Sequence, residues 1–185
     1  MESNDNKVDS NNDNFVGKVD SICCYARSEN KLFTFAITTA HSFQNVNHSG
    51  WVNKKLYQTN LGAIIYYNKT IDLSIIELVK PPKKHPKFTG KISDALAIQK
   101  DDIFTVGKTN IQGIYQTVGN YNRIENCLIY KFVNEKTGYG SSGSYVCSNG
   151  FLIGMHLGID AKLMGCALPF AVINNVLKIR KFEIL

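Results

Sequence analysis

The chain has 185 residues, of which 44% are hydrophobic and 19% charged, so it can bury a core as one large domain or two small lobes without disulfides or metals. Its 21 Lys and Arg residues outnumber its 15 Asp and Glu residues. The net charge of +6 permits contact with anionic partners such as RNA, although no RNA-binding signature accompanies it. Five cysteines, an odd number without a CxxC spacing, argue against a disulfide framework or a zinc site and favour a reducing compartment.

The chain begins with a polar segment. Residues 1–14, MESNDNKVDSNNDN, are rich in Asn and Asp, and we expect them to form a flexible N-terminal arm. This segment lacks the apolar centre of a signal peptide, and no apolar run in the chain reaches the roughly 18 residues that a membrane span requires. We therefore expect a cytoplasmic protein, or a piece released from a longer precursor, with no membrane span.

Short segments with strand character follow the arm. In LFTFAITTAH, apolar residues at Phe33, Phe35 and Ile37 alternate with smaller ones, which is the pattern of a half-buried strand. Similar segments come after it: LGAIIYY, IDLSIIELV, DIFTVG, NCLIYKFV and GFLIGMHLGI. Three of the four prolines fall in residues 80–94 and predict a connector, and a helical pattern after Pro169 predicts a C-terminal helix. The pattern favours a β-barrel or a β-sandwich, and two small barrels fit it as well as a single sandwich does.

Ser142 lies in a loop rich in glycine and serine, GYGSSGS. A serine hydroxyl is a weak nucleophile, so it needs a nearby base, an acid that orients the base, and donors for the developing oxyanion. Among the candidates, His41 ends a strand-like run and Asp72 directly precedes an apolar one, where the strand can shield its carboxylate from water. The weaker candidates lie in polar segments: His48, His85, Asp94 and Asp101.

Three motifs in this order, TAHSF, DLSIIEL and GSSGS, resemble those of the chymotrypsin-fold serine proteases. The resemblance implies an all-β fold, a chymotrypsin-like double β-barrel with a C-terminal helix. It also implies that His41 is the general base, that Asp72 orients it, and that Ser142 is the nucleophile. The N–H groups of Gly140 and Ser142 would form the oxyanion hole. The implied parts are a barrel over residues 15–80, a linker over 81–100, a second barrel over 101–168 and a helix over 169–185.

A histidine fourteen residues after Ser142 narrows the resemblance. The Gly-Met-His segment ending at His156 resembles that of viral 3C-like proteases and glutamyl endopeptidases, in which this histidine binds a Gln or Glu side chain of the substrate. Thr137, five residues before Ser142, and Gly158 complete the implied substrate-binding set. Trypsin-like proteases have an acid six residues before the serine, where this chain has a lysine, and this argues against cleavage after Lys or Arg. Some related enzymes have a serine three residues after the histidine, where this chain has an isoleucine, and this favours Gln over Glu.

The resemblance therefore implies a serine endopeptidase of the viral 3C-like type that needs no cofactor and no metal. Its substrate would be a polypeptide, a viral polyprotein, cut after Gln or Glu in the host cytoplasm. One alternative is a secreted bacterial glutamyl endopeptidase. Another is a catalytically inactive module of the same fold that binds peptide or RNA. A plain β-sandwich interaction domain is a third, and it would not bring His41, Asp72 and Ser142 together.

Overall fold

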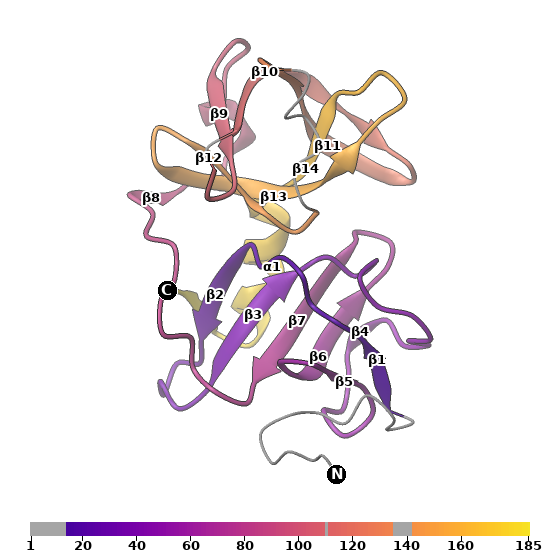
Figure 1. Ribbon diagram of the computed structural model, residues 1–185. Coiled ribbons are helices and arrows are strands. Elements are labelled where there is room, and N and C mark those ends of the chain that lie inside the picture. Colours follow the sequence, from indigo (N-terminus) through magenta and orange to yellow (C-terminus); the bar gives the residue numbers. More distant parts are fainter. Residues whose placement is uncertain (1–13, 110, 135–141) are drawn as a thin grey trace. The chain divides into compact units, whose positions relative to one another are not determined.

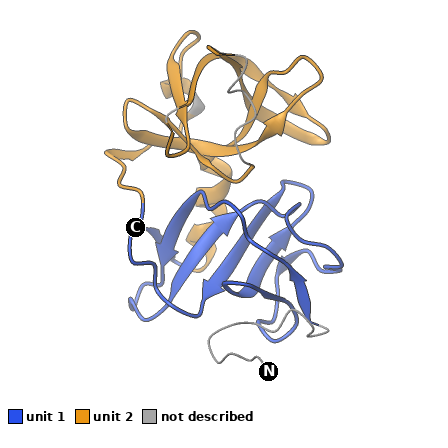
Figure 2. Cartoon of the chain, in the orientation of Figure 1, with its two compact units in different colours: residues 1–85, 181–185 blue, residues 86–180 orange. Residues whose placement is uncertain are grey.

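The computed structural model describes residues 14–109, 111–134 and 142–185, which form two compact units (Figures 1 and 2). Unit 1 comprises the chain up to His85 together with Lys181–Leu185, and unit 2 comprises Pro86–Arg180. The chain thus passes between the units twice, within the segment predicted as a linker and again near its C-terminal end.

Unit 1 is a β-structure of short strands, because its apolar residues alternate with period two and few helix-forming segments separate them. The strands are β1 (Phe15–Gly17), β2 (Cys24–Arg27), β3 (Thr34–Thr38), β4 (Gly50–Trp51), β5 (Gln58–Thr59), β6 (Gly62–Asn68), β7 (Leu73–Leu78) and β15 (Glu183–Ile184). They are ordered β1-β5-β6-β7-β3-β2-β15, with β4 beside β6. Side chains from several of these strands meet in one buried cluster: Val16, Val19, Ala36, Ala40, Phe43, Ile64, Tyr67 and Ile76.

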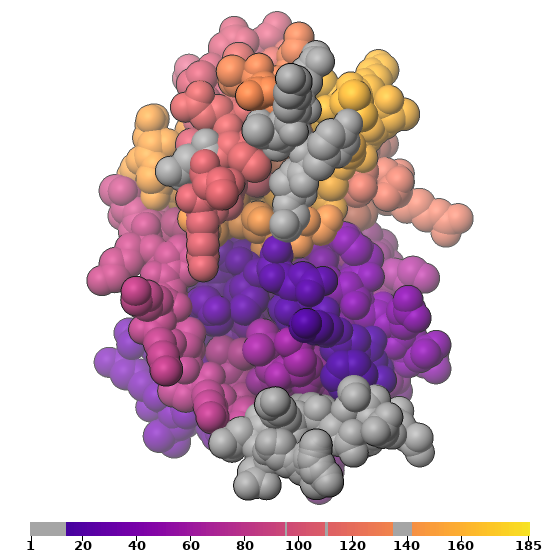
Figure 3. Space-filling view, in the orientation of Figure 1, coloured from indigo at the N-terminus to yellow at the C-terminus, as the bar shows by residue number. Residues whose placement is uncertain are grey.

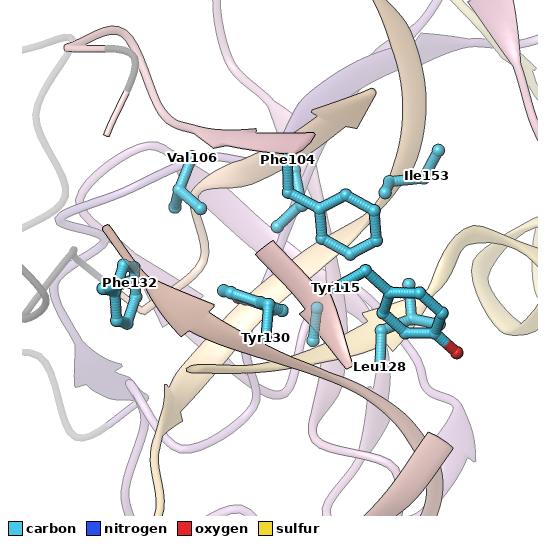
Figure 4. Close-up of a cluster of buried hydrophobic side chains, with 9 residues drawn as sticks. Phe104, Val106, Tyr115, Leu128, Tyr130, Phe132 and Ile153 are labelled. Carbon is cyan, nitrogen blue, oxygen red and sulfur yellow. The ribbon is translucent and has the colours of Figure 1, made fainter. Parts of the chain in front are cut away.

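Unit 2 contains a closed barrel. Its strands are β8 (Gly90–Lys91), β9 (Ile103–Val106), β10 (Ile111–Tyr121), β11 (Ile124–Phe132), β12 (Tyr145–Ser148), β13 (Phe151–Ile159) and β14 (Gly165–Pro169), with a short 3-10 helix at Ala95–Ala97. The order β12-β9-β10-β11-β14-β13 closes because β12 also pairs with β13, and β8 adds to β13. Closure removes the sheet edges that would otherwise expose unpaired backbone groups. Figure 4 shows the buried core of this barrel, in which Phe104 and Tyr115 stack and Tyr130 packs edge-on against Phe104.

The C-terminal helix is shorter than predicted. Helix α1 spans Phe170–Ile179, follows Pro169 at its N-cap, and packs on β13 and β14. The helix predicted over residues 169–185 does not continue beyond this point, because Lys181 adopts a left-handed φ of 57° and the chain then forms β15 beside β2. Phe182 stacks on Phe35 of unit 1 with ring centroids 4.1 Å apart, so a tertiary contact replaces the last helical turns.

Several of the lysines that make the chain basic lie at the surface, whereas its cysteines are buried. The proline-rich segment lies at the surface in the space-filling view (Figure 3). Its lysines are exposed: Lys80, Lys83, Lys84, Lys87 and Lys91. All five cysteines are buried, and none of them forms a disulfide. Within the described ranges, no helix is long and apolar enough to cross a membrane, and no cluster of His, Cys, Asp and Glu could hold a metal ion.

Candidate active site

Strand pairing in unit 1 brings His41 and Asp72 together. His41 lies in the turn that follows β3, and Asp72 is the last residue before β7. Because β3 and β7 are antiparallel neighbours that pair Thr38 with Ser74, the residues just beyond this point on either strand also meet. The His41 backbone N–H donates to Asp72 Oδ1 at 2.8 Å, and His41 Nδ1 lies 2.6 Å from Asp72 Oδ2. The carboxylate thus holds both the backbone and the ring of His41.

The pair has the electrostatic character of a base with its orienting acid. The hydrogen bond that the His41 ring donates to Asp72 raises the pKa of His41 above its ordinary value, partial burial of the ring opposes this, and the Coulomb attraction of the carboxylate adds to the rise. The Asp72 side chain is only 11% exposed, whereas that of His41 is 51% exposed. The acid is therefore shielded while its partner can reach solvent or substrate.

Ser142 lies in unit 2, in the turn that leads into β12. Its hydroxyl donates to the backbone carbonyl of Leu157 on β13 at 2.8 Å. Two backbone bonds hold the rest of the turn against the same strand, from Gly143 N–H to the His156 carbonyl at 2.7 Å and from His156 N–H to the Ser144 carbonyl at 2.8 Å. The serine turn and the histidine strand that the motifs selected are thus joined directly.

The predicted site residues fall into two groups. His41 and Asp72 are in contact within unit 1, and Ser142, His156 and Gly158 lie close along the β12–β13 region of unit 2. The predicted Gly140 and Thr137 lie outside the described residues. The catalytic and binding roles of all these residues stay predictions.

His156 is fully buried and is held by a tyrosine. His156 has 0% exposure on β13, and the Tyr130 hydroxyl on β11 lies 2.5 Å from its Nδ1. Burial, with smaller contributions from two neighbouring cysteines, raises the pKa of Tyr130 well above its ordinary value, so the phenol keeps its proton. In the neutral tautomer in which Nδ1 accepts from the Tyr130 hydroxyl, His156 carries its proton on Nε2, which is then a hydrogen-bond donor.

Tyr130 belongs to none of the motifs, although the sequence contains a weak signal for it. Tyr130 is a large polar-tipped residue inside the apolar segment CLIYKF, and such tyrosines need a partner when buried. Two glycines make room for its ring: a Cβ on Gly113 would lie 2.9 Å from Tyr130 Cδ2, and one on Gly165 would lie 2.6 Å from the same atom. Gly158 contacts another tyrosine, because a Cβ there would overlap the Tyr121 hydroxyl unless that side chain shifted.

Comparison with known proteins identifies the fold. No family model matches the chain, and no curated protein matches it. Solved structures similar to it include alpha-lytic protease homolog N4, with a TM-score of 0.58 and 12% identity over 88% of this chain and 90% of that chain. A glutamic acid specific serine protease, described as using a novel histidine triad in substrate binding, has a TM-score of 0.59 and 14% identity over 89% and 92%. Cellulomonas bogoriensis chymotrypsin has a TM-score of 0.53 and 10% identity over 91% and 98%. These likenesses, at low identity, establish the architecture that the motifs predicted: the chain has the chymotrypsin-like double β-barrel fold with a C-terminal helix.

Proposed function

We propose that this protein is a serine endopeptidase that cleaves polypeptides with His41, Asp72 and Ser142 as its catalytic residues. The observation that carries the proposal is the contact of Asp72 with both the backbone N–H and the Nδ1 of His41. An acid that fixes one ring nitrogen leaves the other, Nε2, as the base, and this is the arrangement that activates a serine hydroxyl. The proposal requires the two units to bring Ser142 within hydrogen-bond reach of that nitrogen.

In the proposed reaction, His41 Nε2 takes the proton of Ser142 as Oγ attacks the scissile carbonyl carbon. Asp72 stabilises the imidazolium that forms. The backbone N–H groups of Gly140 and Ser142 hold the oxyanion, and His41 then gives its proton to the leaving amine. Water repeats the sequence on the acyl-enzyme and releases the acid product. The Ser142 hydroxyl must leave the Leu157 carbonyl and turn to His41 before this can begin.

We further propose that the enzyme prefers Gln at the residue before the scissile bond. The Nε2–H of His156 is suited to a carbonyl or carboxylate oxygen, and Thr137 would add a second donor. A Glu carboxylate would have to lose its water beside a neutral, buried ring, which costs more than placing a neutral amide there. A pocket built to hydrogen-bond in this way can reject side chains without a matching acceptor by about 10⁴-fold.

The viral 3C-like assignment, with a polyprotein substrate in the host cytoplasm, is favoured by five buried cysteines that form no disulfide, which is typical of a reducing compartment. The second candidate is a secreted glutamyl endopeptidase. It is supported by the likeness to a glutamic acid specific protease, whose substrate binding is ascribed to three histidines. In this chain, His156 is the fully buried histidine, whereas His48 is exposed and lies in unit 1.

The test uses labelling first and cleavage second. A fluorophosphonate should label the native chain and Ser144→Ala, a control in the same turn, but should not label Ser142→Ala. Absence of labelling in the folded native protein would favour the inactive binding module. A peptide library varied at the residue before the cut should then be cleaved after Gln by the native chain. Cleavage confined to Glu would favour the glutamyl endopeptidase, and cleavage after Lys or Arg would refute the assignment of the pocket.

A further inference from the structure

Ser74 is a buried polar residue where the strand pattern calls for an apolar one. It lies on β7, two residues after Asp72, and has 0% exposure. It faces the same side of the sheet as Ile76, which belongs to the apolar cluster of unit 1. A buried hydroxyl is costly unless it is hydrogen-bonded, so its partners indicate why it is there.

The partners of Ser74 are backbone carbonyls next to the His41 turn. Its Oγ donates to the Thr39 carbonyl at 3.0 Å, with the Thr38 carbonyl at 3.4 Å as a longer alternative. The regular pairing of β3 with β7 ends at Thr38 and Ser74, so beyond it the buried Thr39 has no partner residue in that ladder. The Ser74 hydroxyl therefore extends the connection between the strands by one residue, toward His41.

Two side-chain links thus join the same two segments. Asp72 holds His41, and two residues away along each segment Ser74 holds Thr39. Asp72 has a left-handed φ of 57°, a conformation that costs a non-glycine residue free energy and persists only where its surroundings determine it. A fixed turn at Thr39 is one such determinant, because it sets where the His41 N–H meets the carboxylate.

We propose that Ser74 is a positioning residue for the His41–Asp72 pair. Its hydroxyl fixes the backbone before His41, so that the N–H and the Nδ1 of His41 reach the carboxylate together. The effect of Ser74 on turnover rests on the proposed function, whereas its effect on the pair does not require the protein to be an enzyme.

The experiment is an NMR titration of the His41 ring in the native protein and in Ser74→Ala, with the His41 signal assigned from His41→Gln. We expect the pKa of His41 to fall in Ser74→Ala toward its ordinary value of about 6.5. We also expect kcat to fall about 10- to 100-fold, with KM little changed, as for other small displacements of a catalytic group.

The matched control is Thr38→Val. The Thr38 hydroxyl is as deeply buried, on the same face of the sheet, and donates to the Ser21 carbonyl at 2.6 Å, away from the His41 turn. This variant should lose thermal stability as Ser74→Ala does but keep the His41 titration of the native protein. Ser74→Cys, with a weaker donor in the same place, should give a His41 pKa between those of the native protein and Ser74→Ala, and it carries the test if Ser74→Ala does not fold.

An unchanged His41 titration in Ser74→Ala, or in Ser74→Cys where that variant carries the test, would overturn the proposal and leave Ser74 a purely structural residue. A shifted titration in a protein that neither cleaves peptides nor reacts with fluorophosphonates would support the proposal while refuting the proposed function.

Discussion

Replacement of Asp72 by Asn tests the central contact of the site. The substitution keeps the size of the side chain but removes its charge and places an amide group beside His41. An amide N–H facing Nδ1 would force the ring proton onto Nε2, so the nitrogen that should take the Ser142 proton would already carry one. The fold should survive, because an amide oxygen can still accept from the His41 backbone N–H.

The expected loss is about 10⁴-fold in kcat, which equals about 5.4 kcal/mol of transition-state stabilisation. The structure supports this magnitude independently. In the transition state the ring of His41 is charged and its Nδ1 lies 2.6 Å from the carboxylate, which at an effective dielectric constant of about 20 corresponds to an attraction of about 6 kcal/mol. The partial exposure of His41 reduces this value.

The assay compares the rate of fluorophosphonate labelling and the kcat for the best library peptide in the native protein and in Asp72→Asn. Glu77→Gln is the matched control, because Glu77 lies on the same strand and pairs with Lys54 at 3.3 Å near the surface, where an ion pair contributes little. The control should keep the native rates. If Asp72→Asn retained more than a tenth of the native kcat, another acid would orient His41 and the assignment would be wrong.

Four further predictions concern the pKa of His41 and two ring contacts. Because Asp72 raises the pKa of His41 and the base must be neutral, kcat/KM should rise with pH through a pKa above about 6.5. The stability that the pair contributes should be complete below about pH 6.5 and disappear as the pH rises through the same pKa. Thermal melts of Asp72→Asn should therefore lack this pH dependence, and melts with the same pH dependence as those of the native protein would contradict the prediction. Gly165→Ala should cost about 1–3 kcal/mol of unfolding free energy, because its Cβ would press on Tyr130. In this variant the selectivity for Gln should fall more than the rate of fluorophosphonate labelling does. An equal fall in both would contradict the proposed role of Tyr130. Phe182→Ala should cost about 2 kcal/mol in chemical denaturation, because it removes the stacking on Phe35, and an unchanged midpoint would show that β15 is not held by this contact.

The sequence was most informative where a motif and a strand pattern coincided. The alternation in LFTFAITT and the apolar run after Asp72 predicted the strands that became β3 and β7. Nothing in either segment states that the two strands are neighbours, and only the chymotrypsin-like motifs linked His41 to Asp72. Their contact then follows from antiparallel pairing, because the segments that continue beyond the last pair, Thr38 with Ser74, lie side by side.

The sequence was misleading where a distant segment decided the structure. The apolar spacing that predicts the C-terminal helix continues through Ile179 and Phe182, so local reasoning extended the helix to the end of the chain. The chain instead forms β15, because β2 has an edge with open backbone groups and Phe35 offers a ring for Phe182. The edge and the ring come from residues 24–35, more than a hundred positions earlier, and a local pattern carries no information about them.

Two polar residues, Ser74 and His156, lie at inward-facing positions of strands, and the motifs indicated a role for the second but not for the first. In unit 1, Ser74 is fully buried in an apolar strand and is bonded to the neighbouring turn, and in unit 2 His156 is fully buried and is bonded to Tyr130 on another strand. Each replaces an apolar side chain that would fill the same space without the cost of burying a polar group. Stability alone therefore does not account for them, whereas their proposed roles, positioning His41 in one unit and binding a substrate side chain in the other, would. Both residues lie inside one of the motifs or within two residues of it. An inward-facing polar residue next to a proposed catalytic motif is therefore the signal by which the sequence could have indicated Ser74 as well as His156.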